Sequence, residues 1–446
     1  MNHYPRYPKH KDSGVDWIGN VPEHWEIARI KRVASLRTER CTNVPKGWQY
    51  VGLEDVEPGT GRFHPTDSDS RQMEDSTVGV FRPGDVLYGK LRPYLKKTIV
   101  GDSDGVCSTE FLVLQPKSVM AQWLHQWLLT TEVTQQIEAG CEGTKMPRAD
   151  WEHVGSIPVP YPSLSEQGET IAALDRETSR IDALIAKKTR FIELLQEKRS
   201  ALITHAVTKG LDPEVKMKDS GVEWIEEVPE HWTITKLKHV SRTLIGLTYA
   251  PEDVVDDGTG ITVLRSSNIQ DGQLDLADIV QVRAVADPEL MVRVGDILIC
   301  SRNGSRALIG KNIQLDERSL GCTFGAFMTV VRGSFNDFLY YVFNSTMFDA
   351  NSALYMTSTV NQLTISMIAN MEVPLPPEEE QRAIVSHLRK GLSSLDVLLF
   401  KTQRSIDLLK ERRSALITAA VTGKIDVRGW VPNALPQTHD LKGANT

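Results

Sequence analysis

Two stretches of the chain place apolar residues at the alternating three- and four-residue spacing that is typical of a coiled coil. Over 165–208 the heptad a and d positions are apolar in 8 of 11 cases, and over 379–422 in 9 of 11. So narrow a stripe suits one partner helix better than the broad face of a globular core. The pattern therefore predicts two long helices that pack against each other. Besides two alanines, the seam comprises Ile171, Leu174, Ile181, Ile185, Ile192, Leu195 and Leu202, and Val385, Leu388, Leu392, Leu395, Leu399, Ile406, Leu409 and Leu416.

Outside these helices the pattern changes to short apolar runs that Gly, Pro and Asp interrupt. FRPGDVLYGK (Phe81 to Lys90) and VRVGDILICS (Val292 to Ser301) each combine a Gly-Asp turn with an apolar strand. Helical patterns follow at 121–138 and 336–351. Strands mixed with helices predict two α/β globules of roughly 150 residues each.

The chain is a tandem duplication. KDSGVDWIGNVPEHW (Lys11 to Trp25) recurs as KDSGVEWIEEVPEHW (Lys218 to Trp232) with 12 of 15 positions identical. RSALITHAVTKGLD, from residue 199, recurs as RSALITAAVTGKID, from residue 413, with 10 of 14 identical. Two copies that each exceed 200 residues favour pseudo-twofold symmetry rather than a solenoid.

Pseudo-twofold symmetry makes the second helix the natural partner of the first, in antiparallel orientation. The start of each helix then meets the end of the other. Equivalent heptads place Arg199 near Leu388 and Leu392, and Arg413 near Ile171 and Leu174. Polar residues at seam positions lower stability but fix the register.

Length, composition and cysteine content exclude several classes of protein. The 446 residues are 40% hydrophobic and 24% charged, which is normal for a soluble globular protein of several domains. There is no apolar run long enough to span a membrane and no secretory signal at the N-terminus. Five scattered cysteines without a CxxC pair fit a reducing compartment. We therefore expect a cytoplasmic protein that makes no membrane contact.

A search for catalytic chemistry finds little. The segment from Gly84 to Lys90 begins like a phosphate-binding loop, but Leu91 replaces the required Ser or Thr. The sequence has no GxGxxG after a strand, no HExxH and no GxSxG. His24 and His231 belong to the repeated PEHW segment and are interpreted as structural rather than catalytic. We expect no metal site and no catalysis by this chain alone.

Cations gather at one equivalent point of each globule, although the net charge is -7. YGKLRPYLKK (88–97) combines four cations with two tyrosines, and the matching segment 301–311 combines cations with Asn and Ser. Such side chains suit contacts to phosphates and base edges, and a solvated hairpin explains the composition equally well. The candidate DNA-binding residues are Lys90, Arg92, Tyr94, Lys96, Lys97, Lys145 and Arg148 in the first globule, and Arg265, Ser266, Asn268, Ser301, Arg302, Asn303 and Arg306 in the second.

The repeated segments, together with Glu166-Gln167 and Glu380-Gln381 at the helix starts, resemble the specificity subunit of Type I restriction-modification systems. The resemblance covers residues 9–426. It implies two target-recognition domains that each read half of a bipartite double-stranded DNA sequence, and an antiparallel coiled coil that sets the spacer. It also implies two methylating subunits that bind S-adenosylmethionine, and motor-nuclease subunits that use ATP and Mg²⁺. This chain itself is expected to bind no cofactor.

The resemblance divides the chain into five parts. The first target-recognition domain with its scaffold segment spans 1–157, the first helix 158–212, the second recognition domain 213–372, the second helix 373–426 and a tail 427–446. Two alternatives keep part of this picture. A related subunit could serve a fused methyltransferase-nuclease, or the chain could be a coiled-coil scaffold with no DNA role.

Overall fold

The computed structural model describes residues 4–65, 77–141, 143, 146–270, 272–283, 287–348, 350 and 362–429. The chain forms two compact units: unit 1 comprises Met1–Lys188 with Arg404–Thr446, and unit 2 comprises Thr189–Gln403. Each unit thus contains one globule and a part of each long helix. The mixed α/β class that the sequence predicts is confirmed.

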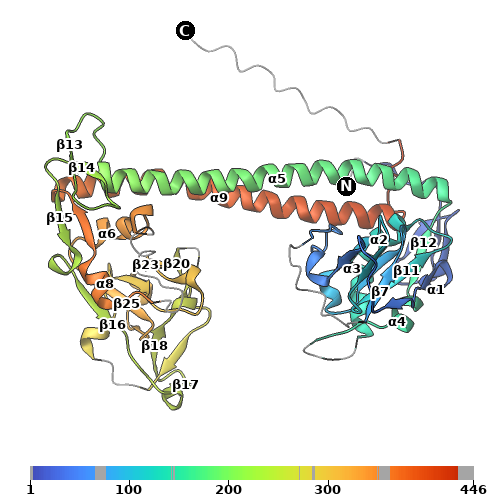
Figure 1. Cartoon of the computed structure of the whole chain (residues 1–446), viewed down its shortest axis with the longest axis horizontal. Coiled ribbons are helices and arrows are strands. Elements are labelled where there is room, and N and C mark those ends of the chain that lie inside the picture. Colours follow the sequence, from blue (N-terminus) through green and yellow to red (C-terminus); the bar gives the residue numbers. More distant parts are fainter. Residues whose placement is uncertain are drawn as a thin grey trace, which may run out of the picture. The chain divides into compact units, whose positions relative to one another are not determined.

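The two long helices are α5 (Leu164–Lys209) and α9 (Glu378–Val421), of 46 and 44 residues (Figure 1). Both begin directly after a proline-rich strand, because proline lacks the N–H that a helix interior needs. Gln167 and Gln381, at equivalent positions, each donate a side-chain hydrogen bond of 2.8 Å to a proline carbonyl before the helix. The repeated Gln therefore fixes the start of each helix.

Unit 1 contains two four-stranded sheets with the strand orders β4-β11-β8-β9 and β5-β7-β10-β6. Two smaller sheets, β1-β2 and β12-β3, complete it. The strands are β1 (His10–Asp12), β2 (Asn20–Pro22), β3 (Glu26–Arg29), β4 (Ala34–Leu36), β5 (Arg40–Cys41), β6 (Gln49–Val51), β7 (Val78–Phe81), β8 (Val86–Gly89), β9 (Thr98–Val100), β10 (Gly105–Cys107), β11 (Phe111–Pro116) and β12 (Pro158–Tyr161). The helices besides α5 and α9 are α1 (Ile30–Val33), α2 (Ala121–Leu128), α3 (Thr131–Ala139) and α4 (Trp151–Ser156), with 3-10 turns η1 (Leu53–Asp55) and η2 (Pro93–Leu95).

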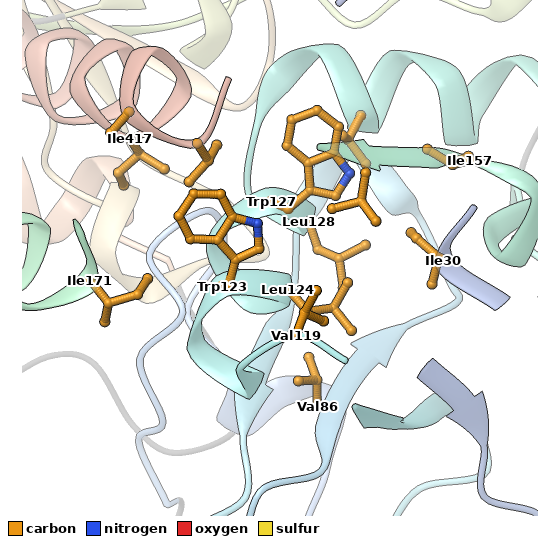
Figure 2. Packing of buried hydrophobic residues seen from close by; sticks show 14 of the residues in the cluster. Ile30, Val86, Val119, Trp123, Leu124, Trp127, Leu128, Ile157, Ile171 and Ile417 are labelled. Carbon is orange, nitrogen blue, oxygen red and sulfur yellow. The ribbon is translucent and has the colours of Figure 1, made fainter. Parts of the chain in front are cut away.

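The core of unit 1 is built around α2. Trp123, Leu124, Trp127 and Leu128 are all fully buried, and Figure 2 shows them among residues from the sheets and from the long helices. Ile171 from α5 and Ile417 from α9 belong to the same cluster (Figure 2). Burying a side chain of this size contributes roughly 1.5–3 kcal/mol. The globule of unit 1 is therefore packed onto its helix pair and is not merely tethered to it.

Unit 2 repeats this plan. Its main sheet has the order β16-β25-β22-β23, which matches β4-β11-β8-β9, whereas its second sheet has the order β17-β21-β18-β24. The strands are β13 (Met217–Asp219), β14 (Glu227–Pro229), β15 (Thr233–Lys236), β16 (Arg242–Ile245), β17 (Val254–Val255), β18 (Ile261–Leu264), β19 (Ile269–Gln270), β20 (Gln273–Leu274), β21 (Val280–Val282), β22 (Ile297–Cys300), β23 (Asn312–Gln314), β24 (Thr323–Phe324), β25 (Met328–Arg332) and β26 (Glu372–Leu375). Besides α5 and α9, its described residues form the helices α6 (Asn336–Phe343) and α8 (Ile365–Asn370), with 3-10 turns η3 (Leu237–His239), η4 (Pro251–Asp253), η5 (Ser266–Asn268), η6 (Pro288–Leu290), η7 (Arg306–Leu308) and η8 (Glu317–Ser319).

The repeated Gly-Asp turn has the same structural role in both units. Asp85 and Asp296 are almost fully buried, and each accepts a backbone hydrogen bond that closes its turn. Each also accepts a hydrogen bond from an arginine, at 2.7 Å from Arg37 Nε directly after β4 and at 2.9 Å from Arg332 Nε in β25. A buried carboxylate is tolerated because it is both paired and hydrogen-bonded. The motif therefore fixes the entry of the central strand of each main sheet.

The repeated PEHW segment binds the start of the neighbouring long helix. Trp25 Nε1 donates to Glu166 at 3.0 Å, and Trp232 Nε1 donates to Glu380 at the same distance. The preceding histidines, His24 and His231, lie 2.8 Å from the same two carboxylates. These contacts explain why the PEHW and EQ segments recur together.

The antiparallel pairing of the two helices is confirmed within each unit. In unit 1 the start of α5 packs in one core with the end of α9, and in unit 2 the end of α5 packs with the start of α9. All fifteen predicted seam residues are buried or half-buried. The coiled coil follows directly from the heptads.

The predicted register of the pairing is wrong by about one to three helical turns. Arg199 forms an ion pair of 2.8 Å with Asp396, one turn beyond Leu392. Arg413 forms an ion pair of 3.1 Å with Asp182, about two turns beyond Leu174 and three beyond Ile171. Apolar heptads alone permit several registers, and the charge pairs select one of them. The two ion pairs are equivalent under the duplication, so both units have the same register.

Candidate nucleic-acid interface

Three chain segments meet where β8 leaves the main sheet of unit 1. The backbone N–H of Lys90 donates to the Glu110 carbonyl at 2.8 Å, and the N–H of Ala149 donates to the Lys90 carbonyl at 2.9 Å. An isolated β-bridge joins Leu91 to Arg148. We call Lys90–Lys97 with Glu110 and Arg148 the edge of unit 1.

The loop after β8 has a strained backbone. Arg92 and Lys96 flank the 3-10 turn η2 with φ values of 53° and 49°, in the left-handed region that few residues other than glycine adopt. A hydrogen bond of 2.9 Å from the Arg92 N–H to the Pro147 carbonyl holds this conformation. The loop is therefore fixed by the chain around it.

The cations of this loop lie in different environments. Arg92 is exposed, and in the part of the chain that the structure describes its guanidinium has no hydrogen-bond or ion-pair partner. Lys96 Nζ donates to Thr131 Oγ1 at 2.8 Å, and burial lowers the pKa of Lys96. Lys97 Nζ donates to the Leu53 carbonyl at 2.6 Å. Tyr94 is half-exposed, so Arg92 and Tyr94 are the side chains that the loop presents most openly.

Arg148 reaches the same edge from a segment far along the chain. Its Nη2 donates to Glu110 Oε1 at 3.0 Å, while the arginine side chain remains 58% exposed. The structure therefore brings Arg148 beside the basic loop, which its distance in sequence does not reveal. Lys145, also predicted as a DNA contact, lies outside the described residues.

Unit 2 repeats this junction with other side chains. The N–H of Ser301, after β22, donates to the Phe327 carbonyl at 3.1 Å, and an isolated β-bridge joins Arg302 to Gln362. The pattern matches Lys90 with Glu110, and Leu91 with Arg148. We call Arg265–Ser267, Ser301–Arg306, Phe327 and Gln362 the edge of unit 2.

Several predicted residues of unit 2 are brought together at this edge. The Arg302 guanidinium lies 5.1 Å from the centre of the Phe327 ring. Asn303 Nδ2 donates to Ser266 Oγ at 3.2 Å, which joins the loop after β22 to η5. Arg306 is exposed on the same loop. Two predicted segments that lie some 40 residues apart in the sequence thus form one surface.

Three predicted residues at or directly behind this edge already have partners within the protein. Asn268 is 1% exposed, and its amide binds the Arg265 N–H and two backbone carbonyls. Ser301 is 5% exposed and donates to the Phe327 carbonyl. Arg265 forms an ion pair with Asp278 at 3.1 Å. Asn268 and Ser301 thus support the edge from inside, in the conformation described.

Glu110, Phe327 and Gln362 were missed by the sequence reasoning. None of the three is a cation or part of a repeated motif, so composition gives no signal. Aligning the two copies on Cys107 and Cys322 places Glu110 opposite Gly325, two residues before Phe327. The equivalence of Glu110 and Phe327 becomes visible only in the backbone hydrogen bonds that their carbonyls accept from Lys90 and Ser301.

A metal site and a membrane-spanning helix are both absent from the described part of the chain. Within the described ranges, no three His, Cys, Asp or Glu residues are grouped as a metal ion requires. Over the same ranges, no helix has the length and apolar character to cross a bilayer.

Comparison with known proteins agrees with the resemblance carried by the repeats. Residues 229–398 match the family model described as the Type I restriction modification DNA specificity domain. The Type I restriction enzyme MjaVIII specificity subunit of Methanocaldococcus jannaschii is 24% identical over 430 residues, covering 92% of this chain and 94% of that subunit. The EcoKI specificity subunit of Escherichia coli is 27% identical over 226 residues, 49% of this chain and 48% of that one.

A solved chain shares the fold. It comes from work on complex assembly and conformational transition of the type I R-M system, and it matches with a TM-score of 0.68 at 21% identity. The match covers 90% of this chain and 98% of the solved chain. The solved chain supports the fold, and the family model and the curated relatives confirm the resemblance predicted from the repeated segments.

Proposed function

This chain carries a Type I restriction modification DNA specificity domain and is related along its length to specificity subunits, and from that premise we propose that it reads DNA for such a complex. Each unit reads one half of a bipartite double-stranded target through its edge. The reading is not catalytic, and the chemistry belongs to other subunits.

One observation carries this proposal. The two edges have the same backbone junction, from β8 and from β22, but present different side chains. Which base is read depends on the hydrogen-bond donors and acceptors of the side chains. The position of those side chains relative to the DNA depends on the backbone that carries them. Two modules that read different half-sites require the same backbone junction with different side chains on it, as these two edges have.

The exposed arginines support direct contact with DNA. Arg92 and Arg306 extend from loops without an internal acceptor among the described residues, and a guanidinium can bind guanine or phosphate in two-point fashion. We propose that Arg92 reads a base, and that Lys96 and Lys97 contact phosphates after exchanging their internal hydrogen bonds.

The partners follow from the duplication and from the family. The scaffold segments occur twice, with nearly the same sequence, so they offer equal binding surfaces to two copies of one partner. We propose that two methylating subunits with S-adenosylmethionine bind there and methylate adenine. Motor-nuclease subunits with ATP and Mg²⁺ join them for restriction.

The test uses the full chain together with the subunits that it assembles with. A library of randomised duplexes is bound, recovered and sequenced, and adenine methylation is mapped in the host with and without the gene. We expect two short conserved half-sites separated by a spacer of constant length, and loss of methylation at those sites without the gene. Binding without any sequence preference contradicts the proposal and leaves only a scaffold role.

A further inference from the structure

One turn residue lies at the same place in both edges. Glu110 directly precedes β11, and Phe327 directly precedes β25. The carbonyl of each accepts the N–H of the first residue after the neighbouring strand, Lys90 or Ser301. The two positions are therefore equivalent in the backbone, although one side chain is an anion and the other an aromatic ring.

Each turn residue holds one exposed arginine. Glu110 Oε1 accepts a hydrogen bond of 3.0 Å from Arg148 Nη2, and the Phe327 ring lies under the Arg302 guanidinium at 5.1 Å. An equivalent β-bridge lies in each unit, from Leu91 to Arg148 in unit 1 and from Arg302 to Gln362 in unit 2. The arginine is the second residue of the bridge in unit 1 and the first in unit 2. Each edge thus has one bridge arginine, fixed by a different physical interaction.

Both interactions leave the donors of the arginine available. A stacked guanidinium uses its face, so its N–H groups in the plane stay free. A guanidinium bound through one Nη keeps its other donors. Phe327 is 59% exposed, so this aromatic residue gains little from burial and is explained better by its contact with Arg302.

We propose that Arg148 and Arg302 each read a guanine in the major groove, and that Glu110 and Phe327 are positioning residues that set base preference by aiming them. This inference rests on the proposed function and makes it specific. Arginine bound to guanine O6 and N7 is the commonest specific contact to a base, and it requires a fixed guanidinium plane. Losing the positioning residue therefore lowers discrimination more than affinity.

The test in unit 2 uses the full chain assembled with its partner subunits, and duplexes that carry the selected target or one changed base pair. Arg302→Ala is expected to lower discrimination at one pair of one half-site by about tenfold. Phe327→Leu keeps apolar bulk but removes the π face, and is expected to lower the same ratio about two- to fivefold. Phe327→Trp, which stacks better, should retain it. The other half-site serves as the internal control.

The matched test in unit 1 uses Glu110→Gln, which keeps an acceptor, beside Glu110→Ala and Arg148→Ala. We expect Arg148→Ala and Glu110→Ala to lower discrimination at one base pair of the half-site that unit 1 reads. Glu110→Gln should give a loss between that of Glu110→Ala and the parent. Thermal unfolding of each variant is measured alongside, and a change in base preference without a change in melting temperature supports positioning.

The outcomes separate the inference from the function on which it rests. A parent complex without any half-site preference contradicts the proposed function itself. A parent with two half-sites whose Arg148 and Arg302 variants discriminate as the parent does overturns the inference alone. Arginine variants that lose discrimination while Phe327→Leu and Glu110→Ala keep it overturn the positioning role.

Discussion

At the scale of single residues, the structure stores backbone strain at the edge of unit 1. Arg92 and Lys96 are two of the three residues other than glycine with positive φ among those described. Each left-handed residue costs roughly 1–2 kcal/mol, and the cost is accepted only where the surrounding chain fixes the conformation. Here the hydrogen bond to Pro147 does so and leaves the Arg92 side chain in solvent. Strain of this kind favours presentation of Arg92 to a ligand.

Replacing Arg92 tests this presentation. We expect Arg92→Ala to relax one base position of one half-site at a cost of about 1–3 kcal/mol, and Arg92→Lys to restore affinity without restoring preference, because lysine lacks the planar fork. Affinity is measured on the target and on single-base variants at two salt concentrations. Arg306→Ala is the matched variant for the other half-site. An Arg92→Ala complex that discriminates like its parent means that the loop is a solvated hairpin.

A buried histidine gives unit 1 a pH dependence. His125 lies in the core with Nε2 3.1 Å from the Thr98 carbonyl oxygen, and burial lowers the pKa of His125 to about 4. Between pH 6.5 and pH 4, His125 is protonated in the unfolded chain but stays neutral in the folded chain. Stability from this group is therefore complete above pH 6.5 and falls as the pH drops toward 4, by up to about 3 kcal/mol.

Denaturant unfolding at pH 7.5 and pH 5 measures this effect. His125→Asn keeps a hydrogen-bond donor but cannot titrate, so it should lose less stability than the parent between the two pH values, whatever it costs at pH 7.5. His10→Asn, at an exposed position, is the control. Equal pH slopes for the parent and His125→Asn contradict the prediction.

At the scale of elements, the helix pair is joined by two equivalent ion pairs with different burial. Arg413 and Asp182 have side chains only 13% and 16% exposed, whereas Arg199 and Asp396 are 33% and 58% exposed. Arg413 also donates to the Thr60 carbonyl, so it ties the globule of unit 1 to its helices. The duplication thus places the same arginine–aspartate ion pair once in a mostly buried and once in a more exposed environment.

Alanine at the two arginines should therefore have unequal effects. We expect Arg413→Ala to cost about 1–3 kcal/mol, because it leaves a poorly exposed carboxylate with one partner fewer. Arg62, 2.6 Å from Asp182, limits that cost. Arg199→Ala should cost at most about 1 kcal/mol. Chemical denaturation of both variants in the full chain provides the comparison, and equal losses argue against burial as the cause.

At the scale of the whole molecule, both long helices run without interruption from one unit into the other. Helices joined along a seam resist bending, and a change of length at one point carries through the helix. The proposed bipartite readout makes helix length the natural determinant of the spacer between half-sites.

Lengthening both helices tests this determinant. Four residues inserted after Lys187, with four more after the equivalent Lys401, add about one turn, or about 5.4 Å. At about 3.4 Å per base pair, we expect the spacer to grow by one to two base pairs while both half-sites stay the same. Methylation mapping in the host reads the spacer. A stable variant with the parental spacer contradicts a ruler role for the coiled coil.

The sequence by itself determined the scaffold of this protein. Heptads, Gly-Asp turns and PEHW segments are local or repeated patterns, and each predicts its own element without knowledge of the rest. The duplication added the antiparallel pairing, because two equal copies pair most simply about a twofold axis. The resemblance to specificity subunits followed from the same repeated residues.

Only the tertiary structure decided the register and the edges. Apolar seams fit several registers, and Asp182 and Asp396 became visible as the selecting partners only once the helices were placed. Arg148 reaches Glu110, and Arg302 reaches Phe327, through strand pairings between segments about 25 to 40 residues apart. Composition could not separate the inward Asn268 from the outward Arg302 either. Contacts between distant segments depend on how strands pair, and no local pattern of residues encodes that.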